Sequence, residues 1–221
     1  MARFVLVCAT ILFSAASLRA QIIRAPGGDP PVLVTATLGF MQLETVADGS
    51  TSSVWDFGSA LQYRVALEKR LGDRMGIGAM VAYASVPLRY ISLDPLGGPT
   101  TCSGGASSCN ASVDHTTIAA LFSTGGSYGF HQVLNLGVGV VMYNNFREDG
   151  TSRALAPLKS DTDFFLSLGY GIGIGLSNRV SINLVQDYSL VMHQRAGLDG
   201  NDDTQQNLLL TRLGVRLGVG R

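Results

Sequence analysis

The feature that most constrains this chain is a strict alternation of large and small side chains that begins at Phe164. Glycine and serine fill most of the positions between the large ones. Successive side chains of a β-strand point to opposite faces, so the pattern predicts a strand with one apolar and one nearly empty face. After a turn at residues 177–179 the alternation resumes and continues to Met192, which predicts a hairpin of two long strands. The large residues before the turn are Phe164, Leu166, Leu168, Tyr170, Ile172, Ile174 and Leu176.

The same alternation recurs elsewhere and predicts eight strands in all. Six further stretches show it, at residues 32–40, 55–68, 75–83, 116–124, 134–143 and 209–219. Each is near the roughly 9–11 residues that a tilted strand needs to cross a bilayer. The connections between them alternate between short and mostly longer, more polar ones, as in a transmembrane barrel with short periplasmic turns and long extracellular loops. The predicted fold is an all-β, eight-stranded antiparallel up-and-down transmembrane β-barrel.

Composition favours a membrane protein over a soluble enzyme. Charged residues make up 14% of the chain, against roughly 25% in a typical soluble domain. Lysine plus arginine and aspartate plus glutamate number 16 each, so the charge balance gives no indication of nucleic acid binding. After the N-terminal region, the sequence has no apolar run long enough for a membrane-spanning helix.

The N-terminal region has the layout of a secretory signal peptide. Arg3 precedes an apolar run over residues 4–13, and small residues follow at 14–17. Cleavage after Ala20 is expected, with Ser17 as the competing position. The predicted organisation is therefore a signal peptide at 1–20, a short proline- and glycine-rich periplasmic leader at 21–31, and a barrel domain at 32–221.

The apolar face of the strands is expected to point outward, toward lipid. The other face is rich in glycine and serine, which suits a narrow lumen better than a water-exposed surface. That face also carries charges of both signs, as an interior network of ion pairs requires. We expect these residues to plug the lumen: Asp56, Arg64, Glu68, Asp187, Arg212 and Arg216.

Aromatic residues lie at the loop-side ends of the predicted strands. Aromatic side chains gather at membrane interfaces, so this placement predicts a girdle at the outer interface. Its predicted members are Phe40, Trp55, Phe57, Tyr83, Phe164 and Tyr188.

The whole predicted barrel resembles the small eight-stranded outer-membrane proteins of the OmpA and OmpX kind. The resemblance rests on the alternating strands and not on a diagnostic motif. It implies residence in the bacterial outer membrane after export, contact with outer-membrane lipid and lipopolysaccharide, and assembly by the barrel-insertion machinery. Members of that family usually end in an aromatic residue, whereas this chain ends Leu217-Gly-Val-Gly-Arg221.

The longest predicted connection, residues 87–114, contains Cys102 and Cys109. Exported proteins reside where disulfides form, so we expect a bridge that closes this loop. No metal site and no cofactor are predicted. The acidic stretch at 199–203 lacks the full spacing of a calcium loop and is interpreted as a solvated turn.

Three function classes remain open at this stage. The leading hypothesis is a non-enzymatic structural or adhesive protein whose loops at 87–114 and 194–203 contact an extracellular ligand. The second is a small pore or a conduit for apolar solutes. The third is a lipid A-modifying enzyme, because Asp187, Ser189 and His193 share one strand face and His115 lies at the end of another strand. No local signature or oxyanion donor supports catalysis, so the expectation is a protein that is not an enzyme.

Overall fold

A computed structural model describes residues 30–49, 51–72, 74–93, 101–126, 128–151, 153–193 and 205–220. The predicted signal peptide and most of the leader lie outside these ranges. Ten strands and one short 3-10 helix, η2, make up the described structure. Their bounds are β1 Val32–Leu43, β2 Val46–Asp48, β3 Ser53–Phe57, β4 Ala60–Arg70, β5 Met75–Ser92, η2 Ser103–Gly105, β6 Ser108–Thr124, β7 Gly129–Glu148, β8 Asp161–Gly175, β9 Val180–Met192 and β10 Gln205–Val219.

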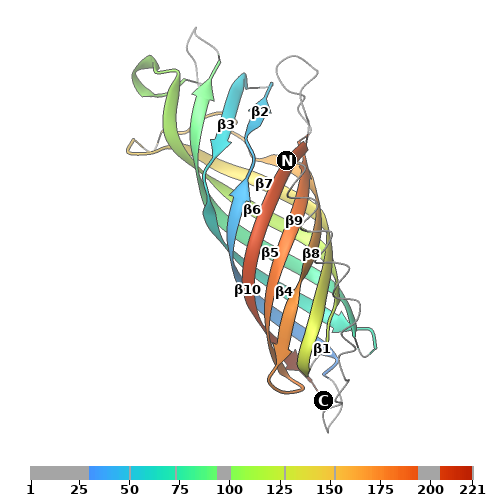
Figure 1. Cartoon of the computed structure of the whole chain (residues 1–221). Helices are drawn as coiled ribbons and strands as arrows, with labels where there is room; N and C mark the ends of the chain where they lie inside the picture. Colours follow the sequence, from blue (N-terminus) through green and yellow to red (C-terminus); the bar gives the residue numbers. More distant parts are fainter. Residues whose placement is uncertain are drawn as a thin grey trace, which may run out of the picture.

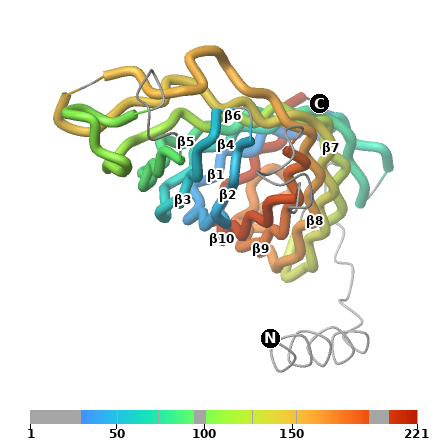
Figure 2. The backbone as a smooth tube through the Cα atoms, turned by 90° about the horizontal axis from the view of Figure 1, so that it is seen from above, coloured from blue at the N-terminus to red at the C-terminus, as the bar shows by residue number. Residues whose placement is uncertain are grey.

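Eight of these strands close into an antiparallel barrel (Figures 1 and 2). Each pairs with its neighbour along the chain from β4 to β10, and β1 closes the wall by pairing with both β4 and β10. The other two strands form a small β2–β3 hairpin, and β3 continues the line of β4 along β5. The predicted eight-stranded barrel is thereby confirmed. Its connections at 71–74, 125–128 and 176–179 are short and share one end, called here the short-turn end.

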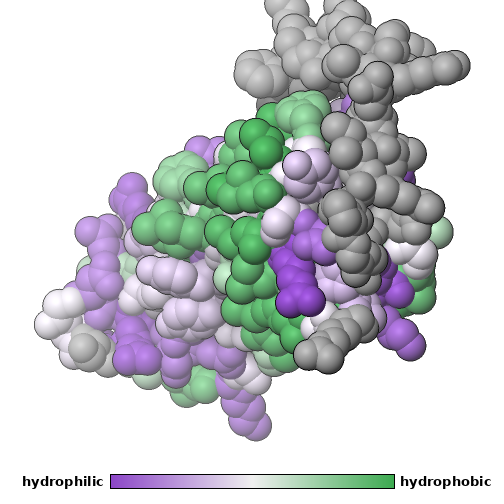
Figure 3. All heavy atoms as spheres, turned by 90° about the horizontal axis from the view of Figure 1, so that it is seen from below, coloured by the Kyte–Doolittle hydropathy of each residue, from purple (hydrophilic) through white to green (hydrophobic). Residues whose placement is uncertain are grey.

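An apolar outer wall surrounds the barrel near the short-turn end. On β8 the exposed side chains include Leu166, Leu168 and Ile172, and the residues between them face the lumen. The other strands show the same alternation, and Figure 3 shows apolar side chains gathered on the outer wall seen from this end. In water such a surface would be costly, whereas lipid solvates it, so the wall identifies a membrane-spanning barrel. Within the described residues, no helix is long and apolar enough to cross a membrane.

The alternation continues beyond this apolar band, but its polarity inverts. On β5, Val81 and Tyr83 face outward and are apolar, whereas Ser85 and Arg89, which face outward further along the strand on either side of Pro87, are polar. On the inner face, glycines give way to Val86, Leu88 and Tyr90, all buried. The same inversion occurs on β6 and β7, whose outer ends project with β5 on one side of the barrel (Figure 1). Lipid therefore faces the lower part of the wall, and water faces the upper part.

The inversion explains why the predicted strand ends were wrong. The connection predicted at 87–114 is only 93–107, because β5 runs to Ser92 and β6 starts at Ser108. Pro87 lies within β5, opposite Ser112. Similarly, β7 continues beyond the predicted strand end at 143 to Glu148, and the connection to β8 is confined to 149–160. The extended strands lift a water-facing sheet above the membrane.

The predicted faces of residues 55–57 were also wrong. Gly58 and Ser59 separate β3 from β4, and between the pairs Phe57–Leu88 and Gln62–Ala84 the β3–β4 side has one residue more than β5. A bulge of one residue moves every side chain before it to the opposite face. Trp55 is therefore buried inside, and Asp56 is exposed outside, where Thr45 Oγ1 donates to its carboxylate at 3.0 Å.

Candidate functional site

The lower lumen contains five of the six charged residues predicted to lie there, and all five are buried. Asp187 on β9 is the centre of one group. Its Oδ2 accepts from Arg212 Nε at 2.5 Å and lies 3.5 Å from Arg64 NH1, and its Oδ1 accepts from Arg212 NH2 at 3.2 Å. In a second group, Arg216 lies 3.8 Å from Glu68, which also accepts a hydrogen bond from Ser123 Oγ. Both arginines that bind Asp187 come from strands other than its own.

Glycines on the inner face make room for these charged side chains. A Cβ atom added at Gly169 would overlap the carboxylate of Asp187 on the neighbouring strand. A Cβ atom at Gly173 would overlap both Asn183 and the ring of His131. The small residues of the alternating pattern are therefore needed where larger inward side chains cross a narrow lumen.

Two small cavities lie beside these charged groups. One cavity lies beside Arg64, Glu68 and Arg216, and a second lies beside Asp187, Ser167 and Phe165. Each has room for about one water molecule.

Above the charged groups, the barrel encloses an aromatic cluster that the alternating pattern did not predict. Trp55 is 0% exposed and lies 4.6 Å from Phe146, 6.0 Å from Tyr143 and 5.4 Å from His193, measured between ring centroids. Phe57 stacks on Tyr143 at 6.1 Å. Trp55 and Phe57 thus belong to this interior cluster and not to the predicted outer girdle.

The other four residues predicted for the girdle have exposed side chains that point outward. They are Phe40, Tyr83, Phe164 and Tyr188. The Tyr83 hydroxyl donates to Asp114 at 2.9 Å. Tyr83 is also the last outward apolar residue of β5 before the polarity inverts at Ser85. A role for these four rings at the membrane interface remains a proposal.

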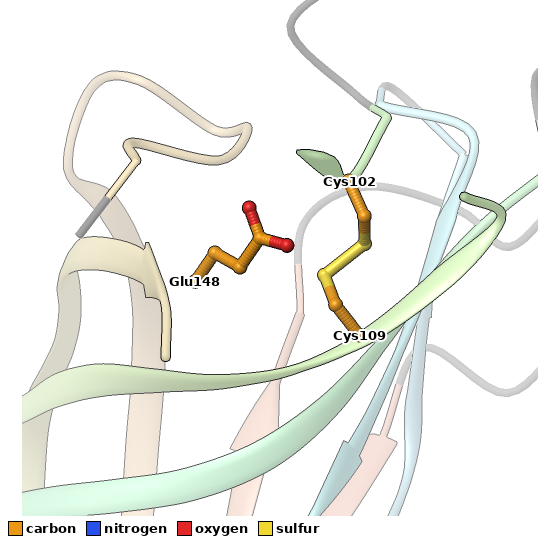
Figure 4. Close-up of side chains that lie close together, drawn as sticks. All are labelled: Cys102, Cys109 and Glu148. Carbon is orange, nitrogen blue, oxygen red and sulfur yellow. A yellow bond between two sulfur atoms is a disulfide. The ribbon is translucent and has the colours of Figure 1, made fainter. Parts of the chain in front are cut away.

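The tip of the β5–β6 hairpin is closed by a disulfide between Cys102 and Cys109, as predicted, with the two Cα atoms 6.0 Å apart. Glu148 at the end of β7 lies beside the bridge (Figure 4). Its carboxylate accepts hydrogen bonds from the Ser103 hydroxyl at 2.5 Å and from the Ser103 amide at 3.2 Å. The Ser103 hydroxyl bond lowers the pKa of Glu148, and the Ser103 amide, Thr151 and Arg153 also lower it. The disulfide therefore joins the two sides of the hairpin, and the hydrogen bonds of Ser103 to Glu148 attach it to β7.

Two aspartates and a histidine form a third polar group, at the long-loop end of the barrel. Asp161 and Asp163 point inward from β8, and His193 follows the last residue of β9. His193 Nδ1 lies 2.7 Å from Asp163 Oδ2 and 3.7 Å from Asp161 Oδ2. Burial acts to lower the pKa of His193, but the hydrogen bond to Asp163 and the charges of Asp163, Asp161 and Asp48 together raise it.

The residues considered for catalysis belong to different groups. Asp187 binds two arginines, whereas His193 contacts Asp161 and Asp163. Ser189 is buried, and His115 is 0% exposed and packs edge-on against Tyr143 at 5.4 Å. The acidic stretch at 199–203 and the rest of the β9–β10 connection lie outside the described residues.

Comparison with known proteins gives a likeness of fold. No family model and no curated protein matches the sequence. Among solved structures, Neisserial surface protein A is 11% identical over 87% of this chain and 99% of its own, with a TM-score of 0.48. OprG from Pseudomonas aeruginosa is 10% identical over 86% of this chain and 97% of its own, and its TM-score is also 0.48. Ail of Yersinia pestis, solved with the heparin analogue sucrose octasulfate, is 13% identical over 84% of this chain and 99% of its own, with a TM-score of 0.43.

Closure of the barrel and its lipid-facing wall decide where this protein resides. An even number of antiparallel strands, short turns at one end and longer connections at the other are the features of bacterial outer-membrane barrels. The chain is an outer-membrane β-barrel protein. Its short-turn end, where β1 begins and β10 ends, then faces the periplasm, and the projecting sheet faces the cell exterior.

Proposed function

We propose that this protein is a non-enzymatic surface-interaction protein that acts through its projecting β5–β6–β7 sheet while its lumen stays closed. The observation that supports this most is the construction of that sheet. It continues beyond the lipid-facing wall, buries its own apolar core on the inner side and presents polar groups on the outer side. A loop that merely connected two strands would not need a core, a disulfide and a carboxylate clamp.

The outer surface of the projecting sheet suits a hydrated, polar partner. Its outward residues include Arg89, Asn110, Asp114, Asn145 and Arg147. Asp114 accepts from Asn145 at 2.6 Å, so part of the surface is pre-ordered. Preordering lowers the entropic cost of binding. The surface starts directly above the membrane band, at the level of lipopolysaccharide sugars, so lipopolysaccharide and extracellular ligands are the proposed partners.

A closed lumen is the second part of the proposal. Two groups of ion pairs cross the lower lumen, and the cavities beside them have room for about one water molecule each. These features favour a plug over the alternative of a pore. The separation of Asp187 from His193 in two different groups likewise disfavours a lipid-modifying enzyme built on those residues.

The proposal is tested by shortening the hairpin tip. Residues 93–107 are replaced by a short Gly/Ser turn, which keeps the Ile91–Ser108 pair and the strands below it. We expect the barrel to insert normally, shown by different gel mobility of unboiled and boiled samples, and adhesion or serum survival to fall. The Cys102→Ser, Cys109→Ser double variant is the matched control, since it keeps every other residue of the tip.

Unchanged adhesion and serum survival in the shortened strain would contradict the role of the hairpin. Permeability to small solutes is measured on the same strains. A lumen that conducts in planar bilayers would contradict the plug, and a change in lipid A mass on expression would support an enzyme instead.

A further inference from the structure

The Asp161–Asp163–His193 group has the composition of a metal-binding site that the proposed surface function does not use. One imidazole nitrogen and two carboxylate oxygens, each able to act as one ligand, all lie within 4.8 Å of one another. Three protein ligands of nitrogen and oxygen type with further positions open are typical of zinc and related first-row dications. Calcium and magnesium prefer all-oxygen sites.

Strand register positions the three side chains. Phe164 pairs with Met192. Asp163 and His193 are the next residues toward the long-loop end, so they lie side by side and point into the barrel. Asp161 is two residues from Asp163 on β8 and therefore points the same way. The ligand set is thus fixed by two adjacent strand ends.

Distances within the group are close to those that a metal requires. Ligand atoms about 2.0–2.2 Å from a zinc ion lie about 3–3.5 Å from one another. His193 Nδ1 is 2.7 Å from Asp163 Oδ2 and 3.7 Å from Asp161 Oδ2, so the observed separations bracket that range.

The surroundings of His193 give a second, independent indication. The residue is 4% exposed, and its Nε2 has no hydrogen-bond partner among the described residues. Trp55 packs edge-on to the ring at 5.4 Å and restricts its orientation. Asp48, which is 0% exposed, lies close enough for its charge to act on His193. Burial and the packing of Trp55 thus hold the imidazole in one orientation beside the carboxylates, which lowers the cost of ordering the side chain when an ion binds.

We infer that Asp161, Asp163 and His193 bind one first-row divalent cation of the zinc type, which joins the extracellular ends of β8 and β9. This inference goes beyond the proposed surface function and does not depend on it.

The test uses the full-length mature protein folded in detergent, stripped with chelator and titrated with Co²⁺ in place of Zn²⁺. We expect one Co²⁺ per chain, visible absorption bands from the bound ion, and displacement by Zn²⁺. His193→Ala and Asp163→Asn should each weaken binding at least tenfold. His131→Ala is the matched control, because His131 is also buried but lies near the short-turn end, and it should leave binding unchanged.

Folding of every variant is checked by heat-dependent gel mobility. Should a variant fail to fold, the wild-type protein still decides, because bound Co²⁺ must broaden the NMR signals of the His193 ring before those of His131. The inference is overturned if wild type binds no stoichiometric Co²⁺, if folded His193→Ala binds as tightly as wild type, or if the His193 signals are unaffected.

Discussion

Replacing Arg212 by methionine should destabilise the barrel strongly, because Arg212 makes most of the contacts to Asp187. The side chain supplies two hydrogen bonds to that carboxylate, at 2.5 and 3.2 Å. Arg64 supplies one longer contact at 3.5 Å. All three residues are buried. After Arg212→Met, Asp187 keeps only the weakest of its three contacts with arginine.

The expected loss follows from the cost of an unpaired buried charge. Breaking a buried ion pair from one side costs about 3–5 kcal/mol. Because Arg64 still compensates part of the charge, we expect Arg212→Met to lie near the lower limit, about 3 kcal/mol, or roughly a hundredfold in the unfolding equilibrium. Asp187→Leu should cost about 5 kcal/mol, since it leaves two buried arginines without their shared carboxylate. Arg64→Met should cost least of the three.

The triple variant Arg64→Met, Asp187→Leu, Arg212→Met separates charge from packing. It removes the whole group and replaces it with apolar side chains, which is often neutral or stabilising in a buried position. We therefore expect the triple variant to be more stable than Asp187→Leu alone. Lys69→Met, on the exposed face of β4, is the matched control for the loss of a cation.

Urea unfolding in lipid vesicles gives the measurement. Trp55 is the only tryptophan of the chain and is 0% exposed inside the barrel, so its emission reports opening of the interior. A free energy of unfolding for Arg212→Met within error of the parent would refute the reasoning, as would a triple variant less stable than Asp187→Leu. In either case the ion pairs would not hold the barrel closed.

Three further outcomes are expected. Gly169→Ala should lower the free energy of unfolding by about 1–3 kcal/mol, because the added Cβ overlaps a carboxylate on the neighbouring strand; parent-like urea unfolding would contradict this. The variant with both Cys102→Ser and Cys109→Ser should keep the heat-dependent gel mobility of the parent and be cleaved faster by protease within 101–107, and equal cleavage would argue against the bridge as a clamp. The lowered pKa of Glu148 means that its carboxylate stabilises the folded hairpin at pH values above the ordinary pKa of 4.5. This contribution is lost as the pH falls below 4.5 and through the lowered pKa. The protection of the Ser103 amide against hydrogen exchange, measured relative to its intrinsic rate at each pH, should fall over that window in the parent but not in Glu148→Gln.

The lipid-facing wall was predictable because alternation encodes it directly. Residues such as Leu166 and Val215 are large, apolar and two apart from similar neighbours, and nothing between them disturbs the period. The inner positions of Arg64, Asp187 and Arg212 follow from the same parity. These predictions needed no knowledge of which residues meet across the lumen.

Other parts could not be predicted for identifiable physical reasons. The bulge at Gly58–Ser59 shifts parity by one, so Trp55 carries the appearance of a lipid-facing residue although it lies inside. Beyond Tyr83 the side chains still alternate, but the apolar ones now point inward. A strand recognised by apolar residues on its outer face is therefore predicted to end at Tyr83, although β5 continues to Ser92. Asp161 and Asp163 become neighbours of His193 only through the pairing of β8 with β9, which no local pattern reveals.

The polarity inversion also fixes how deep the barrel sits in the bilayer. Two residues along a strand tilted by about 40° correspond to roughly 5 Å along the membrane normal. Sinking by that distance would bring Ser85 and Asp114 into hydrocarbon, and rising would expose Val81 and Tyr83 to water. Both displacements raise the free energy, and β5, β6 and β7 all contribute because each carries the inversion. The protein is therefore held at one height, so its projecting sheet meets the same layer of the cell surface in every copy.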